Sequence, residues 1–253
     1  MAYDGAPFHG FARQRDVRTV QGDLETALAK LFDHAAVTVA AGRTDAGVHA
    51  LGQVVSVADA PDGLDLDKAR DAINVMCGPS IAVHSCRRAS AGFSARFSAR
   101  SRTYVYAVCE GPVLDPFLAS TALYHREHLD IGAMNEAGGH LLGPHDFSSF
   151  GRVREPGASA ERNLFELASE RSGTVVRVRA RANAFIQQMV RSIVGTLIQV
   201  GEGGRDPDEI RGILDAHDRA AAGPVAPPHG LCLVAVEYDE GWGVPAGPAP
   251  GWV

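Results

Sequence analysis

The segment from Asn183 to Val200 constrains the fold most, because it has helical length and is apolar almost all the way round. Such a helix must lie largely buried inside the protein. It carries one charge, Arg191, and an unpaired buried charge is very costly. Arg191 therefore either reaches an edge of the helix layer or meets a carboxylate, as part of a site or of a structural ion pair. Its own face is polar and small, as the wall of a site would be: Gln187, Gln188, Val194 and Gly195.

Shorter periodic segments predict a mixed α/β fold. Several strands alternate apolar with polar residues, and their connections have hairpin or single-helix length. This favours a mostly antiparallel or mixed sheet with helices packed on one face over a doubly wound parallel sheet. The expected helices are 19–32, 66–76, 131–142, 184–200 and 207–216, and the expected strands are 36–41, 52–58, 81–86, 101–108, 163–169, 174–181 and 231–238. The glycine- and proline-rich tail, 241–253, has no periodicity, and we expect it to be mobile.

The composition excludes several classes of protein. No run approaches the roughly 18 apolar residues of a membrane span, and nothing at the N-terminus has the pattern of a signal peptide. Phosphate-binding glycine loops are absent, so we expect no nucleotide cofactor. We expect no metal, because the one close histidine pair, His125 and His128, is a weak signal. The four cysteines are widely spaced, which favours the reducing cytoplasm: Cys77, Cys86, Cys109 and Cys232.

The basic residues are unevenly distributed. The formal net charge is −6, and 22 of the 24 basic residues are arginine. Two windows without any acid, 72–109 and 171–201, hold ten of the 24. Arginine's planar fork suits phosphate oxygens. The pattern therefore indicates either a basic groove for a polyanion or an arginine-rich solvated face. The expected strand 174–181 places three arginines on one of its faces: Arg177, Arg179 and Arg181.

Two local patterns suggest chemistry. In the loop AGRTDAGVHA at 41–50, glycines flank Arg43, Asp45 and His49, although spacing alone favours an ordinary turn. In the segment 93–106, arginines alternate with aromatic rings, a pattern typical of proteins that hold unstacked bases. Tyr104 and Tyr106 share one face of the expected strand there, and only one of them needs to face a site.

These patterns occur in the order of a known family. From Tyr3 to Tyr238 the chain resembles the TruA family of tRNA pseudouridine synthases. The blocks that carry the resemblance are YDGAPFHGFARQ at 3–14, RTVQGDLETAL at 18–28, AAGRTDAGVHALGQV at 40–54, FSARFSARSRTYVY at 93–106, LLGPHDFSSF at 141–150, NAFIQQMVRSIVGTLIQVGEG at 183–203 and GLCLVAVEY at 230–238.

The resemblance assigns roles. Asp45 falls on the catalytic aspartate, Arg191 on the basic residue that pairs with it, and Tyr104 on the tyrosine that stacks on the target base. Arg43 falls on the arginine associated with extruding the nucleotide. The other expected substrate contacts are His49, Arg96, Phe97, His145, Asp146 and Phe147.

The resemblance also implies an architecture and a reaction. We expect two α/β halves, 1–95 with the aspartate loop and 96–240 with the tyrosine and the arginine helix, and a basic cleft between them. The enzyme would be a homodimer that needs no cofactor. It would isomerise uridine in the anticodon arm of tRNA at positions 38, 39 and/or 40, by cleaving the glycosidic bond, rotating the base and rejoining it through C5.

Two alternatives come from other classes of protein. A catalytically silent RNA-binding protein would keep the arginines but not both Asp45 and Tyr104. A hydrolase with Asp45 and His49 as its acid–base pair would not need the arginine windows. The chain departs from the family in two places. Few residues precede the YDG block, so we expect a short first strand, and Phe11 stands where the family often has tryptophan.

Overall fold

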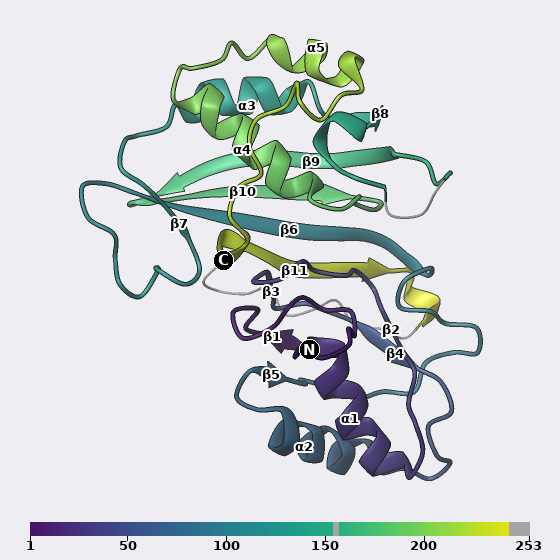
Figure 1. Ribbon diagram of the computed structural model, residues 1–253. Helices are drawn as coiled ribbons and strands as arrows, with labels where there is room; N and C mark the ends of the chain where they lie inside the picture. Colours follow the sequence, from purple (N-terminus) through teal and green to yellow (C-terminus); the bar gives the residue numbers. More distant parts are fainter. Residues whose placement is uncertain (154–156, 243–253) are drawn as a thin grey trace. The chain divides into compact units, whose positions relative to one another are not determined.

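The computed structural model describes residues 1–153 and 157–242 and has the expected mixed α/β class with mostly antiparallel strands (Figure 1). The chain forms two compact units. The first unit holds Met1–Arg102 together with the segment from Cys232, and the second holds Thr103–Leu231. The predicted division after residue 95 stays a prediction. Most of the predicted tail, 243–253, lies outside the described residues.

The first unit is built on very short strands. Strand β1 is only two residues long and pairs antiparallel with β3 on one side and β5 on the other. Strand β11 runs parallel to β3, and β2 and β4 form a separate antiparallel pair. The bounds are β1 Ala2–Tyr3, β2 Thr38–Ala40, β3 His49–Ala50, β4 Val55–Val57, β5 Ile81–Ala82 and β11 Leu231–Tyr238.

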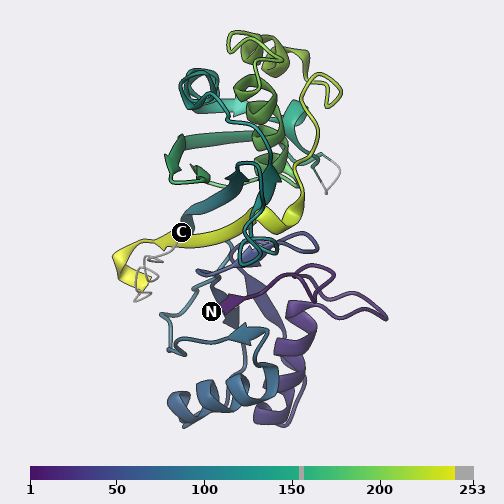
Figure 2. The same ribbon diagram turned by 90° about the vertical axis from the view of Figure 1, so that its left-hand side faces the viewer.

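The second unit packs helices on a longer sheet. In this unit the strand order is β6-β10-β9-β8, with β7 parallel to β6, and α3 packs on both α4 and β9 (Figure 2). The first four residues of strand β6 belong to the first unit, and the strand continues into the second. The bounds are β6 Ala99–Glu110, β7 Leu123–His125, β8 Gly143–Asp146, β9 Glu161–Ser172, β10 Val175–Ala182, α3 Ile131–Gly139, α4 Met189–Gly201 and α5 Glu209–Ala216.

Helix α4 confirms the predicted burial but begins later than predicted. Of its 13 residues, all but Arg191 and Gln199 are buried. The predicted start at residue 184 is wrong, because Gln188 adopts a left-handed conformation with φ of 65°. The backbone of Gln187 instead pairs with Arg152, at 3.0 and 3.1 Å. The backbone at Gln187 is therefore held by a distant segment rather than by the helix.

The arginine face of β10 is partly neutralised. Alternation along the strand buries Val176, Val178, Ala180 and Ala182 fully, which leaves the three arginines on the other face, as predicted. Arg179 and Arg181 both lie beside Glu166 of the adjacent β9, at 3.0 and 3.5 Å. This acid precedes the acid-free window in sequence, so the window does not give a purely basic surface.

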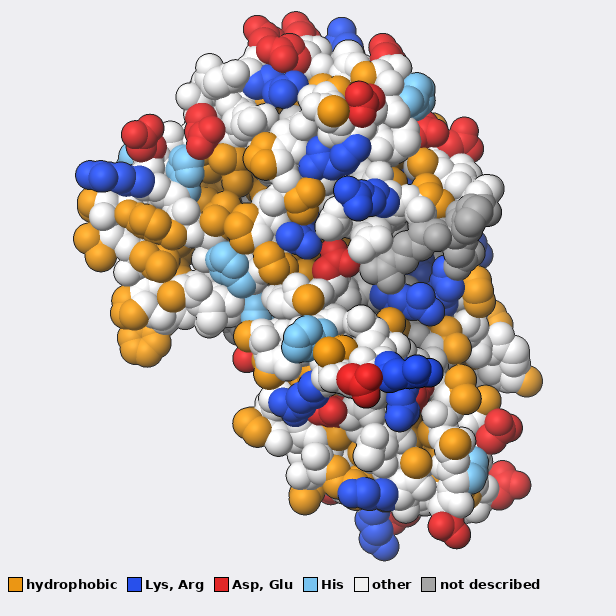
Figure 3. All heavy atoms as spheres, in the orientation of Figure 1, with side chains coloured by type: hydrophobic (Ala, Val, Ile, Leu, Met, Phe, Trp, Pro, Cys, Tyr) orange, Lys and Arg blue, Asp and Glu red, His pale blue; other side chains and the backbone are white. Residues whose placement is uncertain are grey.

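Apolar side chains gather over the loop between β6 and β7 (Figure 3). Val113 and Phe117 in this loop are 78% and 91% exposed. Isolated exposed apolar side chains are ordinary, but a cluster of them marks a candidate contact surface. No helix in the described part of the chain is long and apolar enough to cross a membrane.

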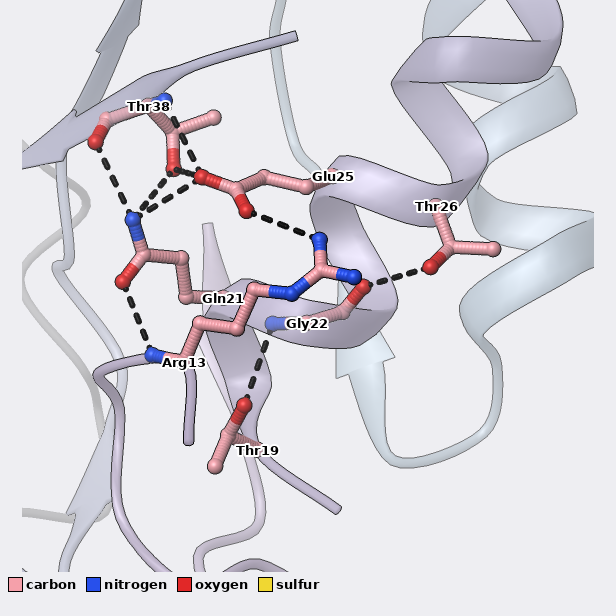
Figure 4. Close-up of polar contacts among 7 residues, drawn as sticks. All are labelled: Arg13, Thr19, Gln21, Gly22, Glu25, Thr26 and Thr38. Atoms are coloured by element: carbon pink, nitrogen blue, oxygen red, sulfur yellow. Dashed lines mark hydrogen bonds and ion pairs between the residues drawn. The ribbon is translucent and has the colours of Figure 1, made fainter. Parts of the chain in front are cut away.

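Helices α1 (Val20–Phe32) and α2 (Leu66–Cys77) pack against each other in the first unit (Figures 1 and 2). Thr19 caps α1, because its hydroxyl accepts the Gly22 N–H at 3.2 Å. One turn later, the buried carboxylate of Glu25 accepts both the N–H and the hydroxyl of Thr38 and pairs with Arg13 (Figure 4). These bonds tie α1 to β2, the strand that leads into the loop carrying Asp45.

Candidate active site

The loop between β2 and β3 presents Asp45 as a half-buried carboxylate and Arg43 as an exposed cation. A turn forms at Asp45, whose carbonyl accepts the Val48 N–H at 3.2 Å. The carbonyl of Thr44 accepts the N–H of Phe11 at 3.0 Å. The loop is therefore fixed by its own turn and by the segment before α1.

Two buried side chains that were not predicted as site residues form hydrogen bonds to this loop. The Gln53 amide, with 1% of the residue exposed, donates to the Gly42 carbonyl at 2.7 Å and accepts the Gly42 N–H at 3.4 Å. The Tyr3 hydroxyl bonds the Thr44 hydroxyl at 2.9 Å and accepts from Gln53 at 3.3 Å. Burial raises the pKa of Tyr3, so its hydroxyl stays protonated. Both residues belong to the family-like blocks, but only tertiary packing shows what they contact.

His49 fastens the other end of the loop to the N-terminal segment. Its Nδ1 accepts the Gly5 N–H at 3.1 Å. The Asp4 carboxylate also lies 3.1 Å from Nδ1. His49 therefore has a structural partner at Nδ1, whatever it does toward a substrate.

The predicted contacts Arg96 and Phe97 form an exposed turn of the first unit. Phe97 is 80% exposed, and the Arg96 guanidinium lies over its ring at 5.3 Å. The turn is well anchored, because the Ser98 N–H donates to the Ser94 carbonyl at 2.9 Å and Ala95 is completely buried. A rigid, exposed ring beside a guanidinium has the geometry of a platform on which a base can stack.

The structure distinguishes the two tyrosines of β6. Tyr106 is fully buried, and its hydroxyl donates to the Pro227 carbonyl at 2.8 Å. Burial raises the pKa of Tyr106, against an opposing effect of the nearby Arg191 cation. Tyr104 retains 7% exposure and meets the ring of Phe185 edge-on at 5.2 Å. Tyr106 is thus a core residue, which favours Tyr104 as the tyrosine that faces a substrate.

Arg191 lies in the first turn of α4 and is half-buried. Its Nε donates to the Ala226 carbonyl at 2.7 Å, while the Ala226 N–H donates back to the Arg191 carbonyl at 3.0 Å. The segment at Ala226 and Pro227 thus holds both Arg191 and Tyr106. These bonds attach Arg191 to the backbone at Ala226, which neither predicted outcome included, and the expected pairing with Asp45 stays a prediction.

The predicted residues His145, Asp146 and Phe147 lie where β8 ends. Phe147 is fully buried against Phe150, with ring centroids 6.3 Å apart. The Asp146 carboxylate accepts the Ser148 N–H at 2.8 Å, and hydrogen bonding with Ser148 holds the pKa of Asp146 below its usual range. His145 bonds the Leu142 carbonyl at 2.9 Å and is half-buried. These hydrogen bonds and ring contacts lie within the protein and fix the conformation of the turn.

The predicted site residues fall into two groups. Asp45, Arg43, His49, Arg96 and Phe97 belong to the first unit. The second unit contributes Tyr104, Arg191 and the 145–147 turn. Within residues 1–153 and 157–242, no three histidines, cysteines or acids come together as a metal site.

Comparison with known proteins gives a consistent result. The family model described as tRNA pseudouridine synthase matches residues 1–98 and 137–239. A tRNA pseudouridine synthase A of Janthinobacterium sp. (strain Marseille) is 41% identical over 96% of this chain and 92% of its own length. The proteins of the same name from Brevibacillus brevis and Dinoroseobacter shibae are 41% and 44% identical, each over 94% of this chain, and over 97% and 94% of their own lengths. The chain belongs to the tRNA pseudouridine synthase family.

Proposed function

We propose that the chain isomerises uridine to pseudouridine in the anticodon arm of tRNA, at positions 38, 39 and/or 40. The observation that carries this proposal is the anchored loop around Asp45. Gln53 brackets Gly42, and Tyr3 holds Thr44, so the carboxylate is presented on a preorganised backbone. Preorganised groups need no rearrangement when charge develops in a transition state. A turn with no function would not need this support from buried polar side chains.

In this proposal, Asp45 attacks the ribose C1′ or supports elimination there, so that the glycosidic bond breaks and uracil is released within the site. The uracil turns, and its C5 forms the new bond to C1′ as the bond from Asp45 to C1′ breaks or the elimination is reversed. The C5 proton is lost, and N1 of the uracil takes up a proton. Tyr104 stacks on the base and takes part in removing the C5 proton. Arg191 pairs with Asp45. These roles require the two groups of residues to meet at one basic cleft.

The roles of the remaining predicted residues follow from their exposure to solvent. Arg43 is exposed and is free to fill the space that the extruded nucleotide leaves. Arg96 and Phe97 form the stacking platform for the RNA. His49, His145 and Asp146 line the cleft, and the buried Phe147 supports it from behind. The reaction changes no oxidation state and consumes no nucleotide, so it requires no redox cofactor and no ATP.

We further propose that the protein is a cytoplasmic homodimer. The dimer follows from the family resemblance. The apolar loop between β6 and β7, with Val113 and Phe117, is the exposed surface we assign to this contact. Sedimentation of the wild type and of Phe117→Glu tests it, since a charge in a dimer contact favours the monomer.

Tritium release from tRNA carrying 5-tritiated uridine tests the reaction, because rejoining through C5 must lose the C5 hydrogen. We expect release by the wild type and by Asp62→Asn, which removes an exposed carboxylate in the same unit. We expect none from Asp45→Asn. Release by Asp45→Asn would show that Asp45 is only a turn residue. Binding of tRNA without release by the wild type would favour the silent RNA-binding alternative.

The position of the reaction is tested with tRNA variants. Replacing the uridine at position 38, 39 or 40 with cytidine, one at a time and in combination, should remove release stepwise. Release that survives replacement of all three would place the reaction outside the proposed segment.

A further inference from the structure

Arg102 of β6 is a buried arginine with a conspicuous set of partners. Only 8% of its surface is exposed. Its guanidinium donates from Nε and Nη2 to the carbonyl of Ala41, at 3.1 and 3.0 Å. It also donates to the carbonyls of Ala99, at 3.2 Å, and Arg96. One side chain thus connects two chain segments that are far apart in sequence.

The first of these segments is the start of the Asp45 loop. The Ala41 N–H donates to the Val54 carbonyl at 2.8 Å, directly after the β2–β4 ladder. The carbonyl of the same residue receives the two bonds from Arg102. Gly42 follows and is held by Gln53. Arg102 therefore fixes the point from which the backbone leaves the sheet toward Asp45.

The second segment is the turn that exposes Phe97. Arg102 holds this turn by the carbonyls of Arg96 and Ala99. From another direction, the Tyr238 hydroxyl donates to the Ala95 carbonyl at 2.7 Å, and the Phe93 ring packs on Tyr238. The position of the exposed ring thus depends on the same guanidinium that anchors the Asp45 loop.

We propose that Arg102 is a positioning residue that fixes the Asp45 loop and the Arg96–Phe97 turn in one geometry. The proposal rests on the proposed function, in which the loop carries the catalytic carboxylate and the turn holds RNA. A guanidinium has five donors in a planar fork, so it reaches both segments at once. Lysine has one nitrogen on a flexible stem and does not reproduce this bridge.

The test compares Arg102→Lys and Arg102→Ala with Gln53→Leu and with Arg70→Ala. Gln53 holds the loop but does not contact the turn, whereas Arg70 pairs on helix α2 with Asp67 and Asp71. Tritium release gives kcat and KM, and thermal unfolding gives Tm. We expect both Arg102 variants to lose about 100-fold in kcat, as misplaced catalytic groups do, and to raise KM for tRNA. Gln53→Leu should lower kcat without raising KM for tRNA, and Arg70→Ala should change neither kcat nor KM.

Chemical rescue separates positioning from stability. Ethylguanidinium should restore part of the kcat of Arg102→Ala, because it supplies the missing fork, and should leave Gln53→Leu unchanged. If Arg102→Ala does not fold, Arg102→Lys carries the kinetic test. A lower Tm with kcat and KM equal to those of Arg70→Ala would overturn the proposal, and so would a loss of kcat with unchanged KM. Failure of the proposed function would appear separately, as release by Asp45→Asn.

Discussion

Gly195 of helix α4 provides a sharp test of the packing that holds Arg191. A Cβ placed on Gly195 would lie 1.8 Å from the Pro224 carbonyl oxygen, where real Cβ contacts begin near 3.0 Å. Gly195→Ala must therefore displace the segment after Pro224 by about 1.2 Å. That segment accepts the Arg191 Nε at Ala226 and the Tyr106 hydroxyl at Pro227. The substitution should loosen both contacts.

The magnitude follows from opposing effects. Replacing glycine with alanine inside a helix stabilises by up to about 1 kcal/mol. Overpacking a tight core costs about 1–3 kcal/mol, and each lost hydrogen bond costs about 1 kcal/mol. We expect Gly195→Ala to lower the free energy of unfolding by about 1–4 kcal/mol. Gly212→Ala in α5 is the matched control, because its Cβ would meet nothing within 4 Å, and it should raise that free energy by up to about 1 kcal/mol.

Urea unfolding followed by circular dichroism measures both variants, and tritium release measures the consequence for Arg191. We expect Gly195→Ala to be less stable than Gly212→Ala by at least about 1 kcal/mol and to release tritium more slowly. Equal stability of the two variants would refute the close packing of α4 on Pro224. Lower stability with full release would refute the idea that this segment positions Arg191.

Three further predictions concern single side chains. Burial opposes the ionisation of Glu110, but bonds from Arg171 and others outweigh it and hold the pKa of Glu110 below 4.5. Its contribution to stability is therefore complete above pH 4.5 and is lost as the pH falls through the folded pKa. Glu110→Gln should cost about 3 kcal/mol in urea unfolding at pH 7 and less at pH 3, and a pH-independent loss would contradict this. Tyr3→Phe should slow tritium release, whereas Tyr124→Phe should not, and equal rates would exclude a role for the Tyr3 hydroxyl in the loop. Phe97→Ala should raise KM for tRNA with unchanged Tm, and an unchanged KM would argue against a stacking platform.

Local signals predicted the elements that local interactions define. The helices expected at 19–32 and 66–76 agree with α1 and α2 to within one residue at each end, and strand β11 has the predicted bounds. The strands β3, β7 and β8 were not predicted, because they have only two to four residues and are defined by pairing with neighbouring strands. The prediction of a helix start at residue 184 was wrong for a related reason. Their sequence suits a helix, but the backbone of Gln187 is paired with a distant segment.

The same contrast between local signals and distant contacts applies to the candidate site. Asp45, Arg191 and Tyr104 were predicted because the resemblance carries them, and the structure adds a physical reason to prefer Tyr104 over Tyr106. The supports of the loop, Tyr3 and Gln53, were not predicted. Their side chains act through contacts across 41 and 11 residues of sequence, and no local period or motif encodes such contacts.

The supports of the Asp45 loop explain why its sequence is ambiguous when it is considered alone. Glycine, threonine and aspartate in a short loop suit any tight turn, because their local backbone preferences are the same in a catalytic loop and in an ordinary turn. What distinguishes this loop is the number of buried groups that hold it, which include the Tyr3 hydroxyl and the Gln53 amide. Burying these polar groups is favourable only while each keeps its partner. A substitution at one of these supporting residues therefore leaves a buried polar group without its partner and also releases the loop. We expect losses of stability and of activity to coincide at these positions.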